Sequence, residues 1–309
     1  MSVVAELSQL KKQKGQGKRR HKDNLAGHLF LAPWTLGLFA ITLIPMLATL
    51  YLAFTDYNLL QAPVFSGMEN IERMIDDQRL HQSLKVTFTY VFTGVPLQLA
   101  VSLAVALFLD RGMRGLSFYR SVFYLPSMLG SSVAIAVLWR QIFGYEGLIN
   151  QVLAMVGIEG RGWVSSPDTA LSTLVILHVW TFGAPMVIFL AGLRQIPDMY
   201  YEAASIDGAS RLKQFFTITI PLLTPIIFFN LVMQIINAFQ NFTQAFIVSG
   251  GQGGPADSTL FYTLYLYQQG FGNFNMGYAA AMAWLLVIII AAFTAINFYA
   301  AKYWVHYDD

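Results

Sequence analysis

The chain has 309 residues, of which 56% are apolar and 15% aromatic, while only 12% are charged. Soluble domains carry about 25% charged residues, so this composition excludes an ordinary soluble domain and indicates a membrane protein. The chain has no cysteine, which excludes disulfides and thiolate metal sites, and its formal net charge of +2 favours no particular partner.

Long apolar runs take the place of the missing charges. Each is at or above the roughly 20 residues that cross a hydrocarbon core of about 30 Å. In chain order the predicted spans are Leu29–Phe54, Val86–Leu109, Phe118–Phe143, Ala170–Leu193, Ile218–Ala238 and Met276–Ala301. Most contain proline, which predicts bent helices. The sequence therefore predicts an all-α membrane protein with six transmembrane helices over residues 27–302.

The Lys and Arg residues are distributed unequally between the two faces. Most lie in the amino-terminal tail over 1–26, which contains KKQKGQGKRRHK, and in the loops that follow the second and fourth spans. The opposite face carries Arg73, Arg79, Lys85, Arg140 and Arg161. The positive face is cytoplasmic, so both the basic tail and the tail over 303–309 are expected inside. We interpret the basic tail as a topology determinant that contacts anionic lipid, not as a nucleic-acid-binding arm.

The run VSGGQGG over 248–254 contains a Ser-Gly-Gly-Gln sequence of the kind found in nucleotide-binding subunits of ATP-driven transporters. It lies in a predicted external loop over about 240–275 that has no Lys or Arg. The chain also lacks a Gly-x-x-x-x-Gly-Lys-Ser/Thr loop, which would hold phosphates through backbone amides. We therefore expect no cofactor or metal on this chain, and we interpret the glycines as turn residues.

The spans contain few ionisable residues, and their polar residues are mostly uncharged. Because Asp, Glu and Lys are absent from the spans, the sequence argues against a proton- or ion-coupled carrier. The fifth span contains a stripe of carboxamides at helical spacing, formed by Asn230, Gln234, Asn237 and Asn241. The stripe either forms interhelical hydrogen bonds, each worth only about 0.6 kcal/mol, or lines a path for an uncharged, hydroxyl-rich solute.

The fourth span adds His178 and Trp180, in LHVWTFG, as candidates for the same cavity. An aromatic ring can stack on the apolar face of a sugar, which is the role expected for Trp180. A single histidine such as His178 also suits a hydrogen-bonded core position, and both alternatives remain open.

The loop between the fourth and fifth spans predicts a helical hairpin over about 197–216. Pro197-Asp198 is typical of a helix start, and Gly208 supplies the turn. Ala203 and Ala204 would allow close approach of a partner. Glu202 and Asp207 would offer charge to a basic partner. Such a hairpin suits insertion into a groove of another protein, although a purely local packing element is the alternative.

This segment resembles the "EAA" loop of membrane subunits of binding-protein-dependent, ATP-driven (ABC) importers. The shared pattern is Glu202-Ala203-Ala204, three residues, Gly208, nine residues and Ile-x-Leu-Pro, with Ile220 here in place of Leu. The resemblance implies a type I ABC importer permease fold in which this loop docks into a separate ATPase. The residues assigned to coupling are Glu202, Ala203, Ala204, Asp207, Gly208, Ile218 and Pro221.

Further stretches, such as LAFTDYNLL (52–60) and GYAAAMAW (277–284), are similar to carbohydrate-importing permeases, and the resemblance covers residues 27–302. It implies a non-catalytic subunit in a prokaryotic cytoplasmic membrane. The implied partners are a second homologous permease in a heterodimer, a dimeric ABC ATPase that binds ATP and Mg, an extracytoplasmic solute-binding protein, and a sugar or oligosaccharide. The alternatives are a stand-alone secondary carrier or structural membrane protein, a non-sugar ABC permease and, least favoured, a membrane enzyme.

Overall fold

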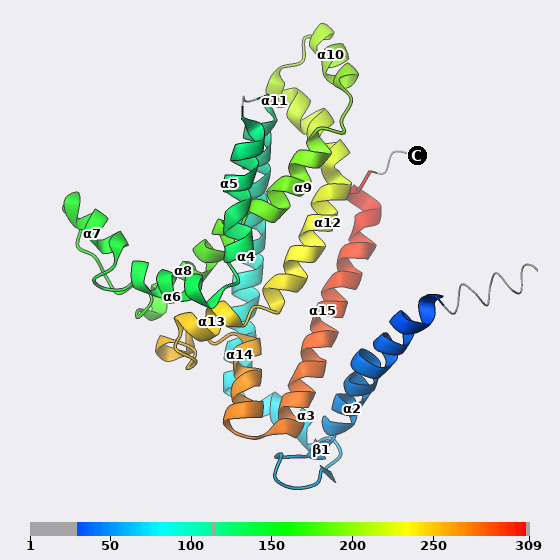
Figure 1. The fold of residues 1–309 in the computed structure, drawn as a ribbon, viewed down its shortest axis with the longest axis vertical. Coiled ribbons are helices and arrows are strands. Elements are labelled where there is room, and N and C mark those ends of the chain that lie inside the picture. Colours follow the sequence, from blue (N-terminus) through cyan, green and yellow to red (C-terminus); the bar gives the residue numbers. More distant parts are fainter. Residues whose placement is uncertain (1–29, 113–114, 307–309) are drawn as a thin grey trace, which may run out of the picture.

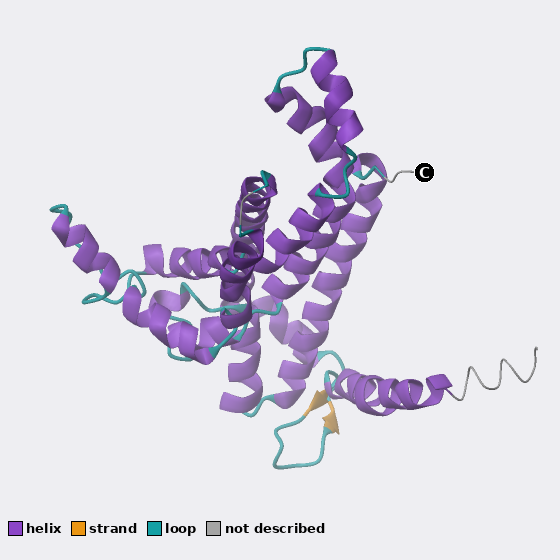
Figure 2. Ribbon diagram, turned by 45° about the horizontal axis from the view of Figure 1, so that its top comes forward, coloured by secondary structure: helices purple, strands orange, loops and turns teal. Residues whose placement is uncertain are grey.

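The computed structural model describes residues 30–112 and 115–306. The basic tail over 1–26, Leu29, Arg114 and the tail residues 307–309 lie outside the described residues. Within them the chain is helical apart from one small antiparallel hairpin, which pairs β1 (Thr55–Asp56) with β2 (Val64–Phe65) (Figure 2). The all-α prediction is therefore confirmed.

The structure contains six candidate spans when each bent helix pair is taken as one crossing. The first is Phe30–Leu52, which includes η1 (Leu38–Leu43) and α2 (Ile44–Leu52), and the second is α4 (Gln78–Asp110). The fifth is Arg211–Phe239 and the sixth is α15 (Met276–Trp304). The fifth begins earlier than predicted because α11 (Arg211–Gln214) and η2 (Phe215–Thr219) run continuously into α12 (Ile220–Phe239).

The third and fourth spans are broken, which corrects the prediction of one helix in each. The third consists of α5 (Leu116–Leu129) and α6 (Val133–Ile142), which meet at 94°, and the fourth of α8 (Pro167–Trp180) and α9 (Gly183–Leu193), which meet at 41°. Pro126 lies in the last turn of α5, and the Ser132 hydroxyl accepts the Ile135 N–H at 3.3 Å to start α6. A proline followed by a new cap ends one helix and begins another.

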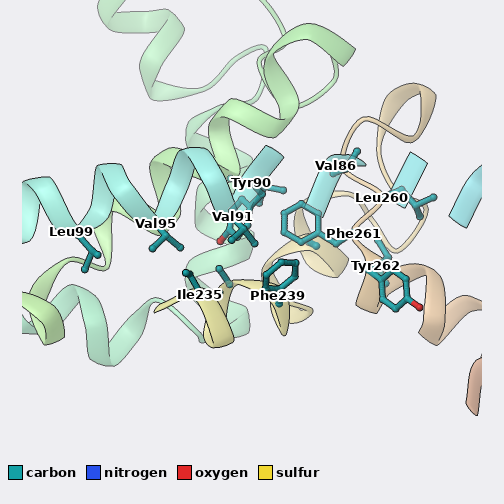
Figure 3. Close-up of a cluster of buried hydrophobic side chains, with 14 of the residues drawn as sticks. Val86, Tyr90, Val91, Val95, Leu99, Ile235, Phe239, Leu260, Phe261 and Tyr262 are labelled. Atoms are coloured by element: carbon teal, nitrogen blue, oxygen red, sulfur yellow. The ribbon is translucent and has the colours of Figure 1, made fainter. Parts of the chain in front are cut away.

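Helix α4 is the centre of the bundle and packs against α8, α9 and α12, while α12 also packs against α15. Buried side chains from α4, α12 and the segment around Phe261 interdigitate in the core (Figure 3). By contrast, the apolar window of the first span has no buried residue, and α2 contacts only the neighbouring η1, β1 and α15 among the stronger element pairs of the described residues (Figure 1).

The two ends of the bundle carry different elements. One end holds α10 (Asp198–Ile206), α11 and the end of α15 (Figure 1). The other holds the β1–β2 hairpin, α3 (Glu69–Asp76), α14 (Tyr262–Tyr267) and η4 (Gln268–Gly272). Helices α7 (Leu148–Met155) and α13 (Thr243–Val248) and the turn η3 (Pro255–Asp257) complete the described elements. The predicted hairpin and external loop are thus on opposite ends.

The end that carries α14 is held together by Asp77, which caps α4. Its carboxylate accepts the Leu80 N–H at 3.0 Å and the hydroxyls of Tyr265 and Tyr278, both at 2.7 Å. Burial raises the pKa of Asp77, but the hydrogen bonds from Tyr278, Tyr265 and the backbone outweigh it, so the pKa lies below its usual value. Burial also raises the pKa of Tyr265 to about 12, which keeps its hydroxyl a donor. This cap explains why α4 begins well before the predicted Val86.

We expect Asp77→Ala to destabilise the folded protein strongly. Loss of an N-cap costs about 1 kcal/mol, and each buried tyrosine hydroxyl left without an acceptor costs about 1 kcal/mol or more. The unfolding midpoint in detergent should fall by roughly 5 °C or more. Asp76→Ala is the matched control, because Asp76 is the exposed neighbouring carboxylate.

The pH dependence of the difference in unfolding midpoint between the wild type and Asp77→Ala follows from the sign of the pKa shift of Asp77. A carboxylate whose pKa is depressed on folding contributes stability above its unfolded value, here 3.8, and loses it as the pH falls through the lower folded value. The gap between the wild-type and Asp77→Ala midpoints should therefore be constant at neutral pH and narrow only below about pH 4. An equal midpoint for both proteins at neutral pH would contradict the assignment.

Candidate functional site

A pocket of about 360 Å³ lies where α4, both broken spans and α12 meet. Its lining contains no Asp, Glu, Lys or Arg. The polar lining residues are Gln98, Ser127, Ser131, His178, Thr181, Gln234, Asn237, Gln240, Asn241, Thr243 and Gln244. We call this cavity the neutral pocket.

The structure brings four of the six predicted pathway residues to the neutral pocket, namely His178, Gln234, Asn237 and Asn241. It does not bring Asn230 there: this side chain is buried and donates to the Ile226 carbonyl of its own helix at 3.1 Å. Trp180 is also outside the lining, and its ring lies 5.9 Å from that of Trp139. The carboxamide stripe therefore has a structural part and a pocket part.

The pocket carboxamides differ in how they are engaged. Asn241 donates to the Tyr90 hydroxyl at 2.6 Å and to Gln244 Oε1 at 2.7 Å, so it links α4 to the α13 segment. Gln234 and Asn237 make no side-chain hydrogen bond to any other described residue. Because a carboxamide offers two donors and an acceptor, these two side chains can bind a solute, whereas Asn241 is held by the protein.

Sequence reasoning missed Gln98, which is only 2% exposed. Its Nε2 donates to the carbonyls of His178 and Thr181, at 3.0 and 3.1 Å, and to Thr181 Oγ1 at 3.0 Å. The available signal was a lone carboxamide in the apolar run VPLQLAV (95–101). A buried amide in a span must be paired, so this position predicted a polar contact without indicating its partner.

The chemistry of the neutral pocket is that of hydrogen bonding without charge. Hydroxyls and carboxamides alternate with the apolar surfaces of Ala184, Pro185 and Phe242. Among the described residues no group of His, Cys, Asp or Glu could hold a metal ion. Such a lining can pair the hydroxyls of an uncharged solute, and it offers no counter-charge to an ion.

The second candidate site is the hairpin of α10 and α11, the coupling hairpin. Helix α10 ends in a Schellman motif: the Gly208 N–H donates to Ser205 O at 3.1 Å and the Ala209 N–H to Ala204 O at 2.9 Å. Gly208 has φ of 78°, in the left-handed region, and an added Cβ would meet nothing within 4 Å. The turn therefore needs glycine for its backbone conformation and leaves open space around the tip.

Side-chain hydrogen bonds close the hairpin. Gln214 Nε2 donates to Ser205 Oγ at 3.0 Å and to the Ala209 carbonyl at 3.2 Å. The hydroxyls of Tyr201 and Thr219 lie 2.9 Å apart and tie α10 to η2. The hairpin is thus a defined element that moves with the start of the fifth span.

The coupling hairpin presents apolar and acidic groups at its tip. Ile206 is 87% and Leu212 70% exposed, and Glu202, Ala203 and Asp207 are exposed as well. Ala204 is partly buried at the helix end. Exposed apolar side chains flanked by charge are typical of a protein interaction surface.

The last two predicted coupling residues have a different position. Ile218 and Pro221 are partly buried at the root of the hairpin, where Pro221 occupies the first turn of α12. They connect the hairpin to the bundle and do not belong to the exposed tip.

Comparisons with known proteins agree with this architecture. Residues 81–303 match the family described as "Binding-protein-dependent transport system inner membrane component". The chain is 53% identical to the probable ABC transporter permease protein YesP of Bacillus subtilis, over 93% of this chain and 94% of the relative. It is 32% identical to the lactose transport system permease protein LacF of Rhizobium radiobacter, over 92% and 96% of the two chains.

The fold is also found in a solved structure of a bacterial alginate ABC transporter in complex with an alginate pentasaccharide-bound periplasmic protein. That chain matches with a TM-score of 0.79 at 17% identity, over 92% of this chain and 96% of its own length. At this identity the likeness shows the type I fold alone. The sequence matches and the fold together show that the chain belongs to the family of inner membrane components of binding-protein-dependent ABC transport systems.

Proposed function

We propose that this permease subunit imports an uncharged sugar or oligosaccharide through the neutral pocket. The observation that carries the proposal is the charge-free, hydrogen-bonding lining, in which Gln234 and Asn237 are not engaged by the protein. A sugar needs many hydroxyl partners and no counter-charge, so this lining suits it. The relationship to a lactose permease supports the same class of solute.

The energy for transport comes from a separate ATPase that binds ATP and Mg and engages the coupling hairpin. The exposed Ile206 and Leu212 would enter an apolar groove, and Glu202 and Asp207 would face basic residues at its rim. This geometry is a helix-in-groove contact. In this proposal the coupling hairpin and both termini are cytoplasmic, and the end with α14 faces the solute-binding protein.

A second, homologous permease completes the path in this proposal. No residue in the apolar window of the first span is buried, and α2 leaves the rest of the bundle near the β1–β2 hairpin (Figure 1). A helix this apolar is stable in contact with lipid. Unlike α4, however, the first span is not surrounded by other helices of this chain, so one side of the bundle stays uncovered. A heterodimer partner that packs there supplies this cover and the other wall of the pathway.

Reconstitution tests the proposal. The chain, its co-encoded second permease and ATPase are placed in liposomes, and the co-encoded binding protein is added with a panel of neutral and acidic oligosaccharides. A Met199→Cys label marks the face that carries α10, since Met199 is 67% exposed there. Uptake of a neutral oligosaccharide should require Mg-ATP on that same face. Uptake by the chain alone without nucleotide would instead show a secondary carrier. Exclusive uptake of acidic sugars would contradict the neutral pocket.

A further inference from the structure

The break in the fourth span has an identifiable cause. Pro185 has no N–H, so the carbonyl of Thr181, four residues earlier, has no helical donor. Side chains from two other spans replace that donor: Gln98 Nε2 at 3.1 Å and Ser127 Oγ at 2.8 Å. Ser127 Oγ also accepts the Ala184 N–H at 2.8 Å. We call the set of Gln98, Ser127 and Thr181 the kink node.

The kink node is also a place where the two broken spans are in close contact. A Cβ on Gly130, at the break of the third span, would lie 2.1 Å from Thr181 Cγ2. A Cβ on Gly183 would lie 2.4 Å from the Phe123 carbonyl oxygen of α5. Only glycine permits these approaches, so the two breaks fit closely against each other.

Helix α9 connects the kink node to the coupling hairpin. It begins at Gly183, directly after the node, and ends at Leu193, five residues before α10 begins at Asp198. The residues at its start, Ala184 and Pro185, line the neutral pocket together with Thr181. A rotation of α9 about its first turn therefore changes the position of the hairpin and the shape of the pocket wall in one movement.

The hydrogen bonding of the kink node and of the adjacent His178 side chain is incomplete in the observed arrangement. Gln98 Oε1 and His178 Nε2 are buried without a partner among the described residues. A buried polar atom without a partner disfavours the state that contains it. An alternative arrangement that pairs either atom gains a hydrogen bond, which makes the node suited to switching between two states.

We propose that the kink node is the pivot through which movement of the coupling hairpin reshapes the neutral pocket, with Gln98 and Ser127 as positioning residues that hold the Thr181 carbonyl. The proposal rests on the proposed function, since it needs an ATPase on the hairpin. The pivot acts through α9. The hairpin moves the Leu193 end of this helix, while the hydrogen bonds of Gln98 and Ser127 hold its Gly183 end in place. The pocket wall at the start of α9 then turns about these hydrogen bonds.

The test measures whether nucleotide changes pocket accessibility. This chain has no cysteine, so Asn237→Cys in the pocket is a single reporter for a methanethiosulfonate reagent. In the assembled transporter, ATP with vanadate should change its labelling rate by about fivefold or more. Adding Gln98→Leu or Ser127→Ala, each of which removes one donor to the Thr181 carbonyl, should reduce this change to less than about twofold, while the ATPase still copurifies and hydrolyses ATP.

Thr173→Val is the matched control. Thr173 is buried on α8, in the same broken span as the kink node, and its hydroxyl donates only to the Ala170 carbonyl of that helix at 2.7 Å. It should leave the nucleotide-dependent change intact. Retention of that change in both Gln98→Leu and Ser127→Ala would overturn the pivot. Failure of both variants to assemble while Thr173→Val assembles would also overturn it, because the node would then be only a folding element. A reporter that ignores nucleotide in the parent chain would contradict the proposed function instead.

Discussion

Gly208→Val is expected to abolish transport while the chain still inserts into the membrane. The left-handed backbone at Gly208 costs an ordinary L-residue roughly 1–2 kcal/mol, and a β-branched residue more. The variant should therefore lose the Schellman hydrogen bonds of Gly208 and Ala209 and rotate the tip that carries Ile206. Uptake should fall by about tenfold or more, since each 1.4 kcal/mol of lost coupling is a factor of ten. The measurement is uptake together with copurification of the ATPase.

Gly208→Asn separates the two reasons for a glycine at this position. Asparagine tolerates the left-handed region, so it should keep the turn but add a side chain to space that is empty in this chain. If Gly208→Asn also releases the ATPase, a partner occupies that space closely. If it transports normally, the backbone conformation alone is required. Normal coupling in Gly208→Val would contradict the assignment of the hairpin.

The coupling hairpin could be predicted from sequence because every feature that forms it is local. Pro197 and Asp198 start α10, Gly208 ends it, and Ser210 caps α11 through the Lys213 N–H at 3.3 Å. All of these residues lie within the single segment 197–213, and helix caps and turns depend on residues that are close together in the chain. The four unbroken candidate spans were predictable for a similar reason, since hydrophobic length is a local property.

The prolines that mark the breaks can be read from the sequence, but the size of each bend and the Gln98 contacts were not predictable, because the residues that pack together at the breaks are separated by long stretches of chain. Pro185 frees the carbonyl of Thr181, but its replacement donors come from residues 98 and 127. Nothing in either local sequence specifies that pairing. The 94° bend between α5 and α6 likewise lies where Gly130 fits closely against Thr181, a contact that is visible only in three dimensions.

The carboxamide stripe shows how far periodicity can reach. Spacing at three or four residues placed Asn230 and Gln234 on one face of the helix, and both do point away from lipid. Yet the Asn230 amide donates to the Ile226 carbonyl of its own helix, and the residue lies one turn before the part of α12 that lines the pocket. Periodicity predicts a direction around the helix axis, whereas membership of the pocket also depends on depth along it.

This division of the stripe leads to the second large expected effect. Gln234→Ala and Asn237→Ala should each raise the KM for uptake by about twofold to tenfold, because each removes a hydrogen-bonding group worth about 0.5–1.5 kcal/mol to a solute in the pocket. If the two contributions add, the double variant should raise KM by about fourfold to a hundredfold. Asn230→Ala should leave KM unchanged, since its amide is satisfied within α12 and does not reach the pocket.

Asn230 is a demanding control because, like the two pocket residues, it carries a carboxamide and lies on the same helix and in the same stripe. A general weakening of α12 would affect all three variants in proportion to burial, and Asn230, at 1% exposed, would then be the most sensitive. A solute path predicts the reverse order, with the more accessible Gln234 and Asn237 dominating KM. Measuring KM and maximal rate for the three variants, with ATPase copurification as the test of assembly, decides between packing and solute binding. KM values equal to that of the parent chain in all three variants would show that these residues of the stripe serve packing and do not bind solute.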